Sequence, residues 1–194
     1  KLFNNAVTGP ISEGWTMAQG SLRGTIYYET YGSQILGGAS SVGIMKIQPG
    51  ATAPTPVKSG CGNVCHTASA DGSTLVANSG SLFNYLVSSS YDLKNNAAVV
   101  FNAPNEMFTY GGVYPDGSIS MSATNYRTWL GGPSKLCDTK TGAILAAPGW
   151  DNVITKGGTT AFSPDGKKLA FIHEDKDSGH TLAVADFALS TKTF

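Results

Sequence analysis

The sequence predicts an all-β fold made of about four repeated units, and three observations favour it. A tight turn that ends in Gly occurs four times, at Gly24, Gly72, Gly117 and Gly166, so the steps are 48, 45 and 49 residues. Short apolar runs of strand type flank these turns. Only 13% of the residues are charged, so the Lys and Glu that suit exposed helix faces are scarce. A repeat of this length with several strands per copy is typical of a β-propeller.

Strands in the first two copies are predicted from runs rich in β-branched and aromatic residues. The first copy has one run directly after Arg23-Gly24 and another before the turn at Pro49-Gly50. The second copy has three runs after Asp71-Gly72. The predicted strands are residues 25–28, 43–47, 74–77, 85–89 and 99–101.

The third and fourth copies have the clearest turns. Pro115-Asp116-Gly117 and Pro164-Asp165-Gly166 place Pro where φ is preset and Gly where φ is positive. Residues 118–122 alternate with period 2, whereas residues 181–186 do not alternate strictly, as expected of a strand covered on both faces. The predicted strands are residues 118–122, 135–138, 143–146, 159–162, 168–172 and 181–186.

The four copies divide a single domain of residues 1–194 into blade units of about 10–56, 57–104, 105–148 and 149–194. Such units cannot each bury both faces alone, so they are expected to stack side by side. One arrangement is a complete small ring in which Lys1–Val7 completes the last blade. The other is an arc of a six- to eight-bladed propeller that its remainder or partner chains complete. The arc is favoured, because Phe194 ends the sequence where a fourth strand should begin.

Composition narrows the functional classes. The net charge is +0, from 13 basic and 13 acidic residues, so nucleic acid and anionic lipid are not expected partners. No stretch reaches the ~18 to 20 apolar residues of a membrane helix. Small polar residues and closely spaced cysteines favour a secreted or periplasmic protein. The sequence has no Gly-x-Ser-x-Gly elbow and no phosphate-binding glycine loop, so nothing in it indicates an enzyme.

One segment carries a family resemblance. Residues 162–171, Phe-Ser-Pro-Asp-Gly-Lys-Lys-Leu-Ala-Phe, resemble the Ser-Pro-Asp-Gly blade motif of TolB-like and WD40-like β-propeller repeats. Weaker matches occur at residues 114–117 and 69–72. The resemblance implies blades at these positions and nothing about activity, since such folds host many unrelated functions.

The main functional signal is Cys61-Gly62-Asn63-Val64-Cys65-His66. A His directly after the second of two close cysteines is the pattern of covalent haem attachment, in which the thiols form thioethers and the imidazole is the proximal iron ligand. The usual spacing has two intervening residues, whereas this one has three, of which Gly62 and Asn63 are small and flexible. Residues 65–72 are also similar to predicted secreted, cytochrome-like propellers of bacteria. That resemblance implies haem c at Cys61, Cys65 and His66, electron transfer, and a redox partner or larger protein assembly.

Two other interpretations of the cysteines stay open. A Cys61–Cys65 disulfide would close a short loop and leave a non-catalytic propeller scaffold or interaction module, with His66 an ordinary strand residue. Cys137 could instead bond either cysteine. Zinc is the weaker alternative, with Cys137 or His173 as a fourth ligand, because adjacent residues of an extended chain point to opposite faces.

A bound haem would also raise the question of a sixth iron ligand. The residues of suitable type are Met45, Met107, Met121, His173 and His180. Met121 belongs to a period-2 strand and is expected in the core. Met107 follows the polar residues 104–106 and is therefore the preferred candidate.

Overall fold

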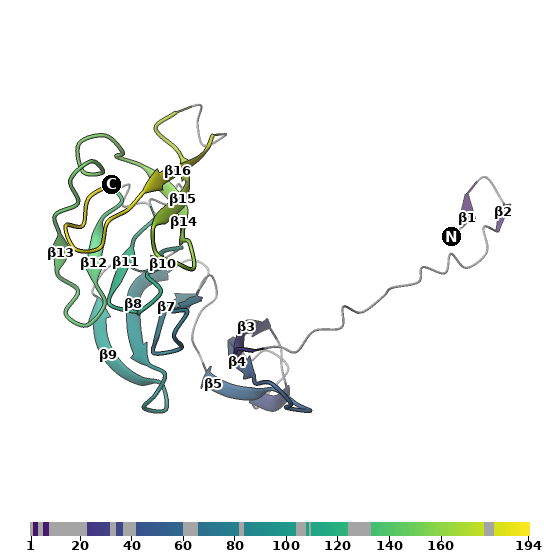
Figure 1. Ribbon diagram of the computed structural model, residues 1–194. Coiled ribbons are helices and arrows are strands. Elements are labelled where there is room, and N and C mark those ends of the chain that lie inside the picture. The colour runs from purple at the N-terminus through teal and green to yellow at the C-terminus, as the bar shows by residue number, and fades with distance from the viewer. Residues whose placement is uncertain are drawn as a thin grey trace.

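The computed structural model describes residues 2–3, 6–7, 23–31, 34–36, 42–59, 66–81, 84–103, 108, 110–123, 133–176 and 181–194. These residues form antiparallel sheets, and each sheet is built from strands that are consecutive in the chain. This all-β arrangement confirms the predicted fold class (Figure 1).

Four sheets follow one another along the chain. The first sheet contains β3 (Ile26–Tyr31), β4 (Val42–Ile47) and β5 (Thr55–Ser59), with the short 3-10 helix η1 (Gln34–Leu36) between β3 and β4. The second sheet contains β6 (His66–Ala68), β7 (Thr74–Ser81), β8 (Asn84–Asp92) and β9 (Ala98–Ala103). The third contains β10 (Gly112–Val113), β11 (Ile119–Met121), β12 (Leu136–Asp138) and β13 (Ile144–Leu145). The fourth contains β14 (Gly157–Phe162), β15 (Lys168–His173) and β16 (Leu182–Asp186).

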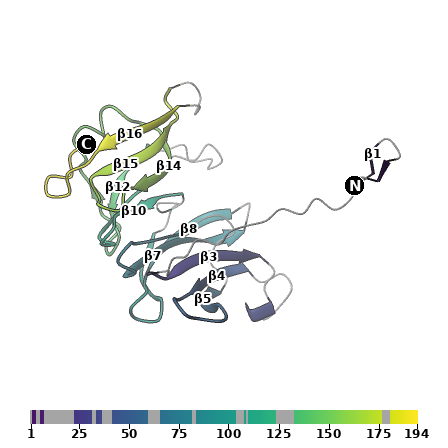
Figure 2. The same ribbon diagram turned by 45° about the vertical axis from the view of Figure 1, so that its right-hand side comes forward.

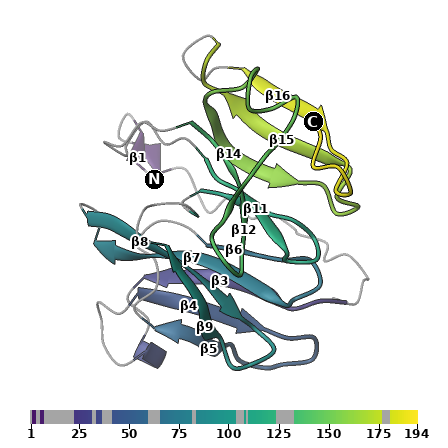
Figure 3. The ribbon, with the colours of Figure 1, turned by 90° about the vertical axis from the view of Figure 1, so that its left-hand side faces the viewer.

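The sheets are stacked in chain order as the blades of a partial propeller. Figures 2 and 3 show the first sheet at one end, the fourth at the other, and the second and third between them. The first strand of the third sheet, β10, contacts the first strands of both neighbouring sheets, β6 and β14. Each sheet therefore contributes one blade to the arc.

The amino-terminal residues do not complete the last blade. β1 (Leu2–Phe3) pairs with β2 (Ala6–Val7) as a separate two-stranded sheet, and within the described residues no ladder joins this hairpin to the fourth sheet. The small-ring arrangement that used Lys1–Val7 as a closing strand is therefore wrong in this respect. Beyond β16, Ala188 and Thr193 form a single β-bridge.

Three of the four predicted turns have the conformation that the sequence demands, whereas Gly24 lies in a bend before β3 without a positive φ, so the turn expected there is wrong. Gly72, Gly117 and Gly166 have φ of +67°, +77° and +69°, which only glycine adopts without strain. In the last of these turns the Asp165 carboxylate accepts hydrogen bonds from the Ser163 hydroxyl and the Lys167 N–H. The turns at Gly72, Gly117 and Gly166 each join the first two strands of their sheet.

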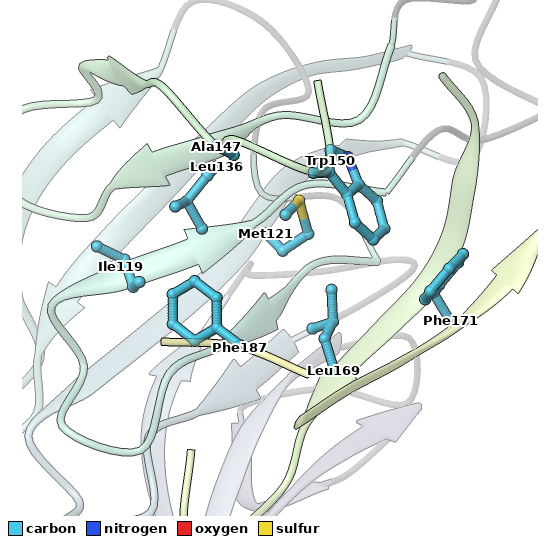
Figure 4. Packing of buried hydrophobic residues seen from close by; sticks show 8 residues of the cluster. All are labelled: Ile119, Met121, Leu136, Ala147, Trp150, Leu169, Phe171 and Phe187. Carbon is cyan, nitrogen blue, oxygen red and sulfur yellow. The ribbon is translucent and has the colours of Figure 1, made fainter. Parts of the chain in front are cut away.

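Apolar clusters between neighbouring sheets hold the arc together. The largest packs the third sheet against the fourth: Ile119, Met121, Leu136, Ala147, Trp150, Leu169, Phe171 and Phe187 (Figure 4). Met121 is fully buried there, as its period-2 strand predicted. In the second sheet, Leu75 packs toward the first sheet and its neighbour Val76 toward the third. Inner blades are thus apolar on both faces.

Candidate functional site

The site begins at the boundary between the first and second sheets. Residues 60–65 connect β5 to β6, and His66 is the first residue of β6. Cys61 and Cys65, the predicted attachment residues, and Met107, the predicted sixth ligand, lie outside the described residues. Of these four predicted residues, His66 lies within the described part of the chain.

His66 faces the first sheet. It pairs with Ala77, and Ala77 packs in the cluster that joins the first two sheets. The next residue, Thr67, points the other way, because its hydroxyl donates to the Gly111 carbonyl beside the third sheet. The alternation of β6 thus directs the half-buried imidazole toward β3.

Burial lowers the pKa of His66 below its ordinary value, and a hydrogen bond to the backbone of Tyr27 acts in the opposite direction. A bond that raises the pKa is one that the imidazole donates, so a backbone carbonyl accepts it. His66 is consequently neutral at neutral pH, with one ring nitrogen donating and the other left as an acceptor. This is the form in which histidine binds metals.

A cavity of about 750 Å³ adjoins this histidine. One wall is formed by Arg23–Tyr27, at the start of β3, and the other by His66–Gly72, which comprises β6 and its turn. The walls combine the apolar side chain of Ile26 with the charged groups of Arg23 and Asp71. Burial opposes ionisation of Asp71, but hydrogen bonds from Ser69 and Ser73 outweigh it, so the pKa of its carboxyl is lowered.

Other residues singled out from the sequence lie away from this cavity. Met45 is buried in β4, and Met121 lies in the core between the third and fourth sheets. His173 ends β15, where its imidazole is 3.9 Å from the Asp175 carboxylate. His180 lies outside the described residues. None of the three described candidates for a sixth ligand lines the cavity.

Cys137 plays no part in the site. Its side chain is buried between the second and third sheets as a free thiol, so the pairing of Cys137 with Cys61 or Cys65 is not formed. Burial raises the pKa of this thiol to about 12, an effect that Lys135 only partly opposes. Among the described residues, no group of three or more His, Cys, Asp or Glu side chains can hold a metal ion.

Two of the residues that line the cavity, Arg23 and Tyr27, were not predicted from the sequence. Arg23 and Tyr27 come from the first repeat, and nothing in their local sequence marks them as neighbours of His66. The available signal was the repeat itself, because Arg23-Gly24 occupies the position that Asp71-Gly72 has one period later.

The described part of the chain contains no helix long and apolar enough to cross a membrane.

No family model matches the sequence, and no curated protein matches it significantly. Among solved structures, TolB from Acinetobacter baumannii is similar with a TM-score of 0.52 and 20% identity, over 86% of this chain and 39% of that one. An oligogalacturonate lyase in complex with manganese has a TM-score of 0.49 and 17% identity, over 77% and 45%. Hydrazine synthase of Kuenenia stuttgartiensis has a TM-score of 0.45 and 14% identity, over 80% and 44%.

The likeness to TolB shows the fold alone: the chain has a TolB-like β-propeller fold, and its four described blade sheets form a partial propeller. It spans about two fifths of the length of that TolB chain.

Proposed function

We propose that this protein is a secreted or periplasmic electron carrier: a β-propeller with a covalently attached haem c at its first blade junction. The observation that carries the proposal is His66, a neutral imidazole directly after Cys65, oriented by the Tyr27 backbone and lining a cavity of about 750 Å³. An iron ligand needs a neutral imidazole, which the lowered pKa of His66 favours, and a hydrogen bond from its second nitrogen to the Tyr27 backbone would hold such a ligand in place.

The residues of the site have the chemistry that covalent attachment of haem requires. Cys61 and Cys65 would each add a thiol across a vinyl group to form a thioether, and His66 would be the proximal ligand. Haem, when bound, supplies the one-electron redox centre. Ile26 offers apolar surface, and Arg23 offers a cation of the kind that haem carboxylates require. Met107 remains the proposed sixth ligand, because the described alternatives Met45 and Met121 are buried in packed cores.

The wild-type protein and two variants, made by bacterial cells equipped for c-type haem attachment, test the proposal. Wild-type protein and Cys137→Ala are expected to keep a haem absorbance band after denaturation and acetone extraction, because a thioether link survives both. Cys61→Ala combined with Cys65→Ala should lose it. Wild-type protein without the band, together with a Cys61–Cys65 disulfide found by peptide mapping, would overturn the proposal in favour of the scaffold.

A further inference from the structure

Few residues of the first sheet are buried against the second. In the apolar cluster between the two sheets, Ile44 is fully buried and Val57 packs at its edge. The other members belong to the second sheet and its loops: Ala68, Leu75, Ala77, Tyr91, Leu93 and Ala97. The cluster between the third and fourth sheets instead receives large side chains from both, such as Leu136 and Leu169. Within the described residues, the first sheet is therefore held less firmly by its neighbour than the fourth sheet is, and it should open more readily.

A carboxyl group lies on the face of the first sheet that makes this contact. Glu29 of β3 is paired with Ile44 of β4, and Ile44 is paired with Lys58 of β5. Residues that are paired across antiparallel strands project from the same face, so Glu29 faces the second sheet together with Ile44. Lys58 does the same, because its Nζ lies 5.4 Å from the centre of the Tyr91 ring in β8. The small apolar contact thus has a titratable group directly beside it.

One oxygen of this carboxyl group has no hydrogen-bond partner. The Tyr31 hydroxyl donates to Oε2 of Glu29 at 2.9 Å, whereas Oε1 is buried and unpaired. A buried oxygen without a donor costs more free energy when the carboxyl group is ionised than when it is neutral. Burial accordingly raises the pKa of Glu29, and the bond from Tyr31, which acts in the opposite direction, only partly offsets this.

Charged groups that could neutralise Glu29 are few. The titratable side chains on its face of the first sheet, and those that face it from the second, are Tyr27, Tyr31, Lys46, Lys58, His66 and Tyr91. β7 has no titratable side chain. The Lys58 ammonium lies over the Tyr91 ring, two strands from Glu29. Among the described residues, no ion pair joins Glu29 to a lysine, arginine or histidine, so a negative charge on Glu29 would not be compensated.

We propose that Glu29 makes the contact between the first and second sheets sensitive to pH. A protonated Glu29 carboxyl group can stay buried in this contact, whereas an ionised one gains hydration of both oxygens when the sheets separate. A carboxyl group whose pKa is raised by folding stabilises the packed form below its ordinary value of 4.5, and this contribution is lost as the pH rises through the folded pKa. The cavity beside His66 has walls from both sheets, so their separation opens it. Rising pH thus increases access to His66.

Native-state hydrogen exchange of the full chain from about pH 4 to 7.5 tests the proposal, with protection calculated against the intrinsic exchange rate at each pH. Glu29→Gln keeps the size of the side chain and removes its charge. In peptides covering residues 26–31 and 42–47, this variant and the wild-type chain should be almost equally protected at about pH 4, whereas at about pH 7.5 the wild-type chain should be at least ~3-fold less protected. His66 titrates in both proteins, so the comparison isolates the contribution of Glu29.

Glu174→Gln is the matched control, because burial also raises the pKa of Glu174, which follows β15 in the fourth sheet; it should leave the protection of the first sheet unchanged. His66→Gln keeps Glu29 and removes the opposing titration, so first-sheet protection should fall with rising pH relative to residues 168–173. Constant relative protection in His66→Gln would overturn the proposal. So would a Glu29→Gln effect that is equal in the first and fourth sheets or that Glu174→Gln reproduces. Such results leave the haem proposal untouched, since it does not involve Glu29.

Discussion

The imidazole of His66 in the second sheet is hydrogen-bonded to the backbone of Tyr27 in the first sheet. The packing of two blades thus fixes the orientation of the one described side chain in the Cys-Cys-His motif. Because the partner is a backbone group, the bond depends on the register between the sheets and not on the side chain at position 27.

Protonation of His66 should cost stability when haem cannot attach. In a Cys61→Ala/Cys65→Ala background, the lowered pKa of the folded state means that the unfolded chain binds a proton first as the pH falls below 6.5. The free energy of unfolding is therefore undiminished by His66 above this pH, and it declines as the pH falls toward the pKa of His66 in the folded chain. Urea denaturation between about pH 8 and 5 measures the decline.

His66→Gln should make the free energy of unfolding depend less on pH over this range. His173→Gln, which removes the other described histidine, should leave the part of the decline that is due to His66 unchanged. An identical pH dependence with and without His66 would show that burial does not oppose its protonation.

Trp150 should be the most costly truncation in the core. Its ring is fully buried, lies 4.7 Å from Phe171 and 5.1 Å from Phe194 between centroids, and donates Nε1–H to the Ser134 carbonyl at 3.3 Å. Trp150→Ala should lower the free energy of unfolding by about 3 to 5 kcal/mol, through lost burial and the cavity left behind. Val153→Ala, at a residue that is 67% exposed, should change it by less than ~0.5 kcal/mol. If Trp150→Ala and Val153→Ala lowered the free energy of unfolding equally, the burial of Trp150 in this core would be contradicted.

The turn glycines should differ in tolerance. Gly166 has a φ of +69°, and a Cβ there would collide with the Tyr114 ring, so Gly166→Ala should cost about 1 to 3 kcal/mol. Gly24 lacks a positive φ, and a Cβ there meets nothing within 4 Å. Gly24→Ala should be neutral within ~0.5 kcal/mol by thermal or urea unfolding. If Gly166→Ala left the free energy of unfolding unchanged, the positive φ of Gly166 and its contact with Tyr114 would be contradicted.

Cys137 should be inert in the folded protein. Its buried thiol has a pKa of about 12, so almost no thiolate is present at pH 8. In the Cys61→Ala/Cys65→Ala background, a thiol-reactive disulfide reagent should label Cys137 at least ~100-fold more slowly than in urea. Rapid labelling without denaturant would contradict its burial between the second and third sheets.

Much of the blade architecture could be predicted from local chemistry. Asp-Gly turns restrict the backbone within a few residues, so the turns at Gly72, Gly117 and Gly166 were found where the structure has them. β5 was missed, because Pro56 argues against a strand and its pairing with β4 contains a bulge. The closing role assigned to Lys1–Val7 failed, because those residues pair among themselves.

The site was harder to predict than the fold. The motif around His66 is visible in the sequence, whereas its contact with Tyr27 exists only after two blades pack. The same holds for Cys137, for which a bond to Cys61 or Cys65 stayed open until its strand placed it on a face toward the second sheet.

Whether Cys61 and Cys65 carry haem beside His66 is decided most directly by the intact mass of the denatured, unreduced protein from c-type-competent cells. We expect the mass of the polypeptide plus one haem. A mass equal to the polypeptide less two hydrogens, as a disulfide would give, contradicts it.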